Sequence, residues 1–220
     1  MLKLADFSAV IFDMDGLVLD TESTYIIAWQ QAANAMGYDF SDAFCRSLSG
    51  RHYQDVELKL IEYCGAEFNV QTFNRLSGDF WREHVDIHGI KIKHGFIGLL
   101  ELLIRQKIPY CLATNSLAEN ALECLELAGI EEVFSIIITR DHVLQGKPEP
   151  DIFLKAAELL QVDISRCLVI EDSHTGIVAA SRAGAVSVFI PSIARVDPLT
   201  VELCDLMISD LEQLTHIIRA

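Results

Sequence analysis

The sequence predicts an α/β protein in which a doubly wound parallel sheet carries a helical domain inserted after its first strand. Short apolar runs alternate with longer segments of helical spacing over most of the 220 residues. These runs are apolar nearly throughout, as expected of parallel strands that are covered on both faces. One region, from about residue 21 to about residue 92, breaks the alternation because it has helical patterns and no convincing strand.

Six apolar runs are the expected strands: residues 8–13, 108–114, 134–139, 166–172, 185–190 and 205–209. Four segments between them have helical spacing: residues 95–106, 117–129, 150–161 and 174–184. Two of these segments end on a glycine, Gly129 or Gly184, which is a frequent residue at helix C-termini. Alternating strands and helices predict a doubly wound parallel sheet.

The inserted region contains three segments that resemble amphipathic helices, residues 21–37, 53–65 and 70–86. Because the sheet pattern resumes after them, we interpret the insertion as a helical cap over a sheet domain. We therefore expect a catalytic core of residues 1–19 and 93–220 and a cap domain of residues 20–92.

The composition excludes several classes of partner. The formal net charge is −15, and a chain this acidic does not attract nucleic acid or anionic membrane. No apolar run reaches the roughly 18 residues that a membrane span needs, and the first residues show no signal-peptide pattern. The six cysteines are scattered, which favours reduced core thiols in a cytoplasmic protein. We expect a monomer or a weak homodimer.

Polar residues and one glycine gather where the expected strands end, which is the edge at which doubly wound sheets bind ligands. In chain order they are Asp13, Asp15, Gly16, Thr114, Asn115, Ser116, Glu171, Asp172 and Ser173, with Lys147 in the loop before the helix at Pro150. Each residue alone has an ordinary explanation as a turn residue, a helix cap or a solvated lysine.

Together the same residues predict a site for phosphoryl transfer. Four carboxylates at one edge would repel one another unless a divalent cation were bound. Magnesium favours carboxylates, waters and phosphate oxygens. A lysine, a hydroxyl and helix N-terminal amides would form the anion-binding half of the same site. Phosphoryl transfer depends mostly on such positioning and charge stabilisation.

Four motifs resemble those of the haloacid dehalogenase (HAD) superfamily of phosphohydrolases, in the family's order and at similar spacing. "FDMDGLVLDTE" resembles the first motif, and "CLATNS" resembles the second. "GKPEPDIF" is similar to the third, lysine-bearing motif, and "VIEDSHTGIVAASRAG" to the fourth. The resemblance covers essentially the whole chain and implies a Rossmann-like HAD core. The helical insert resembles the cap of the β-phosphoglucomutase-like phosphatases.

This resemblance implies a magnesium-dependent phosphatase that hydrolyses a small phosphorylated metabolite, such as a sugar or polyol phosphate. Asp13 would be the nucleophile that becomes an aspartyl-phosphate. Asp15 would protonate the leaving alkoxide and later act as base toward water. Gly16 would let the backbone turn, so that both carboxylates reach one phosphoryl group.

The resemblance also implies a ligand set. Mg²⁺ would bind the carboxylate of Asp13, the backbone carbonyl of Asp15 and the carboxylate of Asp172, and Glu171 would join directly or through water. The groups that would hold the phosphoryl oxygens and neutralise their charge are Thr114, the amides near Asn115, and Lys147.

The cap should choose the substrate. Its candidate substrate-binding residues are Glu22, Tyr25, Arg51, His52 and Arg82. Residues 47–55 resemble a cap loop that dips toward the active site, although an exposed polar loop explains them equally well. His84 and His88 lie four residues apart on an expected helix, and we expect a solvated pair rather than a metal site.

Several alternatives stay open. A dehalogenase lacks the second acid, so Asp15 argues against it, and Lys59 carries no specific signature of a phosphonatase. Hexose-phosphate mutases share the Ala28-Trp29 pair, but they tend to carry a histidine where this chain has Tyr25. A receiver-type signalling domain is shorter, has no helical insert, and places its acidic pair and its phospho-acceptor on different strands.

Overall fold

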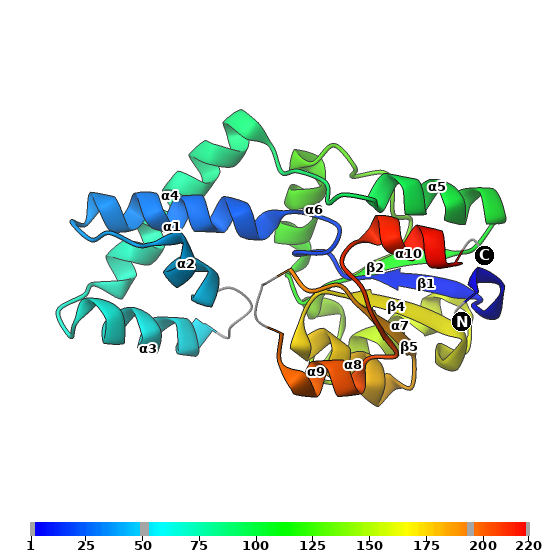
Figure 1. The fold of residues 1–220 in the computed structure, drawn as a ribbon. Helices are drawn as coiled ribbons and strands as arrows, with labels where there is room; N and C mark the ends of the chain where they lie inside the picture. Colours follow the sequence, from blue (N-terminus) through cyan, green and yellow to red (C-terminus); the bar gives the residue numbers. More distant parts are fainter. Residues whose placement is uncertain (1–2, 49–52, 193–195, 219–220) are drawn as a thin grey trace. The chain divides into compact units, whose positions relative to one another are not determined.

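The computed structural model describes residues 3–48, 53–192 and 196–218. The chain forms two compact units, one of residues 1–20 and 91–220 and the other of residues 21–90 (Figure 1). The first unit contains a parallel sheet and the second unit is helical.

The sheet has six parallel strands in the order β3-β2-β1-β4-β5-β6. The strands are β1 (Ala9–Phe12), β2 (Tyr110–Ala113), β3 (Ile137–Ile138), β4 (Cys167–Glu171), β5 (Val186–Phe189) and β6 (Leu206–Met207). Each lies within a run predicted from the sequence, which confirms the doubly wound sheet. Because the chain leaves β1 toward β2 on one side and β4 lies on the other, the ends of β1 and β4 flank the topological switch point.

Helices cover both faces of this sheet. They are α5 (Phe96–Gln106), α6 (Ala118–Leu127), α7 (Asp151–Leu160), α8 (His174–Ala183), α9 (Pro198–Leu203) and α10 (Leu211–Ile218). Short 3-10 turns occur at η1 (Leu4–Asp6), η2 (Arg140–His142) and η3 (Ile164–Arg166). In Figure 1, α5 and α10 lie on one face, and α7 and α8 lie on the other.

The alternation of side chains along β1 explains its unbroken apolar sequence. Ile11 belongs to the core that contains Ile152 and Phe153 of α7, whereas the ring of Phe12 meets Phe96 of α5 at 5.6 Å between centroids. Every residue of β1 is therefore fully buried. The strand predicted at 134–139 is shorter than expected, because Phe134 precedes β3 and packs its ring against Phe12 instead.

The helical unit consists of α1 (Thr21–Ala35), α2 (Asp42–Leu48), α3 (Tyr53–Cys64) and α4 (Val70–His88). Its core includes Ile26, Phe40, Leu60 and Phe73. Helix α2 lies outside the predicted segments, because a seven-residue helix is too short to display a clear period. An Asp42–Arg46 ion pair at 2.7 Å links its first and last turns.

Candidate active site

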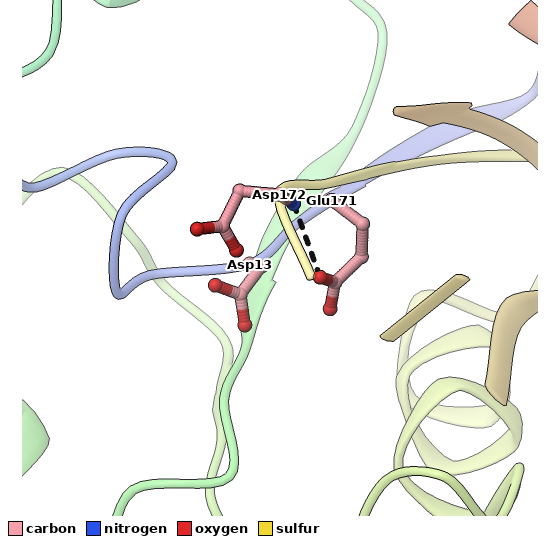
Figure 2. Close-up of side chains that lie close together, drawn as sticks. All are labelled: Asp13, Glu171 and Asp172. Atoms are coloured by element: carbon pink, nitrogen blue, oxygen red, sulfur yellow. Dashed lines mark hydrogen bonds between the residues drawn. The ribbon is translucent and has the colours of Figure 1, made fainter. Parts of the chain in front are cut away.

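The ends of β1 and β4 place three carboxylates together. Asp13 follows β1, Glu171 ends β4 and Asp172 follows it. All three residues are buried, and one oxygen from each lies within 4.8 Å of the others. Figure 2 shows the carboxylate of Asp172 beside that of Asp13, with Glu171 extending from the adjacent strand end. The backbone N–H of Asp13 donates to the carbonyl of Ile170 at 3.0 Å, which ties the two strand ends together.

Lys147 lies between two of these carboxylates. Its Nζ donates to Oδ1 of Asp13, to Oε1 of Glu171 at 2.6 Å, and to the carbonyl of Ala113 at 2.8 Å. The lysine is only 8% exposed. Burial alone would lower the pKa of Lys147, but the attraction of Asp13 and Glu171 outweighs burial and raises it. The two carboxylates therefore favour the charged ammonium form of Lys147 and hold it in place.

One lysine does not balance the charge of the cluster. Burial, together with the charges of Glu171 and Asp15, raises the pKa of Asp13 to about 8, although Lys147 opposes this shift. If Asp13, Glu171 and Asp172 were all ionised, they and the one ammonium would sum to two unbalanced negative charges (three minus one), which adds to burial in raising the pKa of Asp13. Buried charges without partners are costly. Three oxygen donors with this charge fit a hard divalent cation such as Mg²⁺.

The second oxygen of Glu171 is held by its own loop. Oε2 accepts from the backbone N–H groups of Asp172 and Ser173, each at 3.2 Å, and from Oγ of Ser173 at 2.9 Å. Oγ of Ser173 in turn accepts from the N–H of Gly176 at 3.0 Å, as the N-cap of α8. A Cβ at residue 176 would overlap the Glu171 carboxylate. Gly176 was not among the candidate residues, because its closeness to Glu171 arises only from the fold.

Asp15 belongs to a second, less buried group. Its Oδ2 accepts from Oγ of Ser116 at 2.7 Å and lies 3.4 Å from Oγ1 of Thr114. Ser116, which sequence reasoning treated as a helix cap, therefore orients the predicted general acid. Gly16 has a φ of 81°, and a Cβ there would overlap the carboxylate of Asp172. The glycine is needed both for the turn and for this close approach.

Asn115 holds the backbone of Lys147. Its Oδ1 accepts from the N–H of Lys147 at 2.8 Å, and its Nδ2 donates to the Lys147 carbonyl at 3.0 Å. Gly146 permits this approach, because a Cβ there would overlap Oδ1 of Asn115. From α8, Arg182 donates to the carbonyl of Pro148 at 3.1 Å and fixes the other side of the loop. The side chain of Asn115 thus positions Lys147. The backbone N–H of Asn115 is then the group of this residue that could bind phosphate.

The predicted cap residues lie on the helical unit, and we describe them within that unit. Glu22 and Tyr25 are on α1, and Arg82 on α4 places its guanidinium 5.1 Å from the ring centroid of Trp81. Arg51 and His52 lie outside the described residues. The rings of His84 and His88 are 4.8 Å apart. In the described part of the chain, only the Asp13, Glu171 and Asp172 cluster brings three or more potential metal ligands together.

Comparison with known proteins identifies the family. The family model of haloacid dehalogenase-like hydrolases matches residues 10–190, and the chain belongs to this family. A "Phosphorylated carbohydrates phosphatase" of Thermotoga maritima is 31% identical over 80% of this chain and 81% of its own length. A "Beta-phosphoglucomutase" of Bacillus subtilis is 30% identical over 82% of this chain and 81% of its own length.

A solved structure supports the same assignment. The crystal structure of a putative β-phosphoglucomutase from Thermotoga maritima aligns with a TM-score of 0.82 and 26% identity, covering 96% of this chain and 98% of that one. The family assignment made from the four motifs is therefore confirmed. In the described residues, no helix combines the length and the apolar character that crossing a bilayer requires.

Proposed function

We propose that this protein is a magnesium-dependent phosphatase that hydrolyses a small phosphorylated metabolite, such as a sugar or polyol phosphate, through an aspartyl-phosphate. The observation that supports it most is the contact of Lys147 with both Asp13 and Glu171 at the switch point of the sheet. A nucleophilic carboxylate needs a neighbouring cation, because it must approach an anionic phosphate ester. The similarity to a phosphatase of phosphorylated carbohydrates supports the substrate class.

Four groups would hold the metal ion: the carboxylates of Asp13 and Asp172, the backbone carbonyl of Asp15, and Glu171 directly or through water. A bound Mg²⁺ would neutralise the negative charge of the phosphate ester and of the surrounding carboxylates. Lys147 would share this task through its contacts with Asp13 and Glu171. Its hydrogen bond to Glu171 leaves less of that carboxylate for the metal, which favours coordination of Glu171 through water.

The carboxylate of Asp13 attacks phosphorus, and the bond between phosphorus and the ester oxygen breaks. Asp15, protonated at this stage, gives its proton to the departing alkoxide, so that a neutral alcohol leaves. Asp15 then takes a proton from a water molecule whose oxygen attacks the phosphorus. The bond between phosphorus and Asp13 breaks, which releases inorganic phosphate and restores both carboxylates to their starting states.

Hydrogen-bond donors near Asp15 would stabilise the charge on the phosphoryl oxygens. Thr114 and Ser116 carry hydroxyls within reach of Asp15. The backbone N–H groups of Asp15 and Asn115 have no hydrogen-bond acceptor within the described part of the chain. Polar groups of this kind fit an anion site, because an oxyanion would satisfy them.

We further propose that the sheet unit is the catalytic core and that the helical unit is a cap that selects the substrate through Glu22, Tyr25, Arg51 and His52. The six cysteines are free thiols, which supports a cytoplasmic location. The partner of the enzyme is a small phosphorylated molecule, and the net charge of −15 argues against nucleic acid or anionic lipid. Either a monomer or a weak homodimer would suit this function.

The second candidate is a hexose-phosphate mutase, which two of the similar proteins favour by name. A mutase must keep water from the aspartyl-phosphate while a sugar hydroxyl accepts the phosphoryl group. Tyr25 stands where the mutases tend to carry a histidine, so we propose water as the main acceptor. Phosphorus NMR of the products from a hexose 1-phosphate separates the two reactions. Free phosphate supports the phosphatase, and an isomeric sugar phosphate as the dominant product supports the mutase.

The proposed function is tested by a screen of phosphorylated metabolites with Mg²⁺ present, reading free phosphate, and by the variant Asp13→Asn. We expect this variant to lose all measurable turnover, because an amide neither attacks phosphorus nor binds the metal as a carboxylate does. Its circular dichroism spectrum should match that of the wild type. Substantial activity in a folded Asp13→Asn variant would show that the mechanism is wrong.

A further inference from the structure

The helical unit contains a pocket whose lining includes Tyr25, one of the residues proposed to select the substrate. It has a volume of about 250 Å³ and is lined by residues of α1 and α4. The lining residues are Tyr25, Trp29, Asn74, Ser77, Gly78 and Trp81. Three of these six residues are aromatic and none is an acid or a base, although the chain as a whole is strongly acidic. The pocket is therefore suited to a neutral ligand rather than to a phosphate group.

The aromatic side chains form one ordered stack. The ring of Tyr25 lies 5.7 Å from that of Trp81 with an interplanar angle of 12°, and 6.2 Å from that of Trp29. Trp81 is anchored because its Nε1 donates to Oγ1 of Thr24 at 2.9 Å. Tyr25 keeps 39% of its surface exposed, whereas Trp81 keeps 9%. A rigid aromatic surface is thus built within this unit and stays partly open.

Ser77 supplies a second and independent observation. It is 8% exposed, and its Oγ is the one buried side-chain polar atom without a hydrogen-bond partner among the described residues. A buried hydroxyl without a partner destabilises the folded protein, because it has given up its hydrogen bonds to water. The next residue, Gly78, is in the interior of α4, where glycine is unfavourable, and a Cβ there would meet nothing within 4 Å. Neither residue is explained by packing, and both line the pocket.

We propose that this pocket binds a neutral ring that carries hydroxyl groups, such as the ring of a sugar. The C–H bonds on one face of such a ring carry partial positive charge and are attracted to the faces of aromatic side chains. A ligand hydroxyl would satisfy the Oγ of Ser77. The volume lies below the roughly 300–1,000 Å³ of sites for drug-sized ligands, so it suits one ring rather than a whole nucleoside.

This proposal rests on the proposed function for its ligand class, because a sugar phosphatase must recognise a sugar ring. It adds a restriction, since it favours cyclic sugars over acyclic polyols. A linear polyol presents no rigid C–H face to the aromatic stack and would lose more conformational entropy on binding.

The chain offers a direct probe of the pocket, because its two tryptophans are Trp29 and Trp81 and both line it. Selectively excited indole fluorescence therefore reports on this pocket alone. We suggest titrating the Asp13→Asn variant, which cannot turn over substrate, with methyl glycosides of glucose, galactose, mannose and ribose. Sorbitol and uracil serve as comparisons. We expect a saturable change with at least one glycoside and a weaker response to sorbitol and uracil.

Two substitutions sharpen the test. Ser77→Ala should weaken glycoside binding roughly five- to tenfold, because it removes one hydrogen bond to the ligand. It should not lower the Tm, because the hydroxyl has no partner among the residues that the structure describes. Gly78→Leu should abolish binding by filling the pocket. Tyr63→Ser is the matched control, because Tyr63 stacks on Phe44 outside the pocket, and it should leave binding unchanged.

The proposal is wrong if no glycoside gives a saturable response, or if sorbitol or uracil gives an equal or stronger one. It is also wrong if the Ser77→Ala variant binds glycosides as tightly as its parent or melts at a lower temperature. Its failure is distinguishable from failure of the proposed function. If the protein hydrolyses phosphate esters but its tryptophan fluorescence does not respond to glycosides, the proposed sugar pocket is wrong and the proposed phosphatase function stands. If the protein binds glycosides but hydrolyses no phosphate ester, the proposed phosphatase function is wrong and the sugar pocket stands.

Discussion

The side chain of Asn115 makes two hydrogen bonds to the backbone of Lys147, accepting its N–H at 2.8 Å and donating to its carbonyl at 3.0 Å. A carboxamide can bind the N–H and the carbonyl of Lys147 at once, in the same way as the backbone of a neighbouring β-strand binds both groups of a residue. Because the ammonium of Lys147 contacts Asp13 and Glu171, this pair links the loop after β2 to the reactive carboxylates.

We therefore predict that Asn115→Asp lowers kcat roughly two- to tenfold and changes KM little, through the loss of about one hydrogen bond. Aspartate can still accept the N–H of Lys147, but it places an oxygen against the Lys147 carbonyl. The control is Asn69→Asp, at the N-cap of α4, where Oδ1 accepts from the N–H of Thr72 and aspartate serves equally well. A rise in KM with kcat unchanged would instead identify the Asn115 side chain as a phosphate ligand.

Asp15→Asn should separate the two classes of leaving group. A substrate with a poor alkoxide leaving group should lose roughly 10²–10⁴-fold in rate, because it needs the proton. An activated aryl phosphate should lose less in its first step. Single-turnover measurements with both substrates check this difference. Ser116→Ala, which removes the 2.7 Å hydrogen bond to Asp15, should change both rates in the same direction by a smaller factor. Equal losses for both substrates in Asp15→Asn would exclude Asp15 as the acid.

Gly176→Ala should destabilise the protein by about 1–3 kcal/mol, because its Cβ would overlap the carboxylate of Glu171, which is fully buried. Urea denaturation measures the change. Gly98→Ala is the control, since Gly98 lies within α5 and a Cβ there meets nothing within 4 Å. That substitution should stabilise the protein by about 0.5–1 kcal/mol through helix propensity. Similar effects of the two substitutions would contradict the packing of Gly176 against Glu171.

Much of the fold followed from the sequence because its signals are local. β1 and the first four residues of β4 are apolar, since helices cover both faces of the sheet. Asp13 follows β1 and Glu171 ends β4 at the switch point. The hydrogen bonds between Asn115 and Lys147 could not be predicted, because they join loops 32 residues apart whose approach depends on the whole sheet. The stack of Trp81 on Tyr25 likewise depends on how α1 meets α4.

The last prediction concerns the metal ion and Asp172. Three buried carboxylates face one ammonium, and their burial and mutual repulsion raise the pKa of Asp13, so a divalent cation that lets all three ionise should stabilise the folded protein. Saturating Mg²⁺ raises the free energy of unfolding by about 2.7 kcal/mol at 100 times the dissociation constant, and the Tm should be higher with Mg²⁺ than with EDTA. Asp172→Asn removes one charge and one ligand.

We expect the Asp172→Asn variant to melt no earlier than the wild type in EDTA, because the repulsion is reduced, and to gain much less stability from Mg²⁺. Asp86→Asn, on an exposed position of α4, is the matched control and should keep the full response to the metal. Calorimetric titration with Mg²⁺ gives the affinities directly. If Asp172→Asn binds Mg²⁺ as tightly as the wild type, Asp172 is not a ligand and the charge imbalance is relieved in another way.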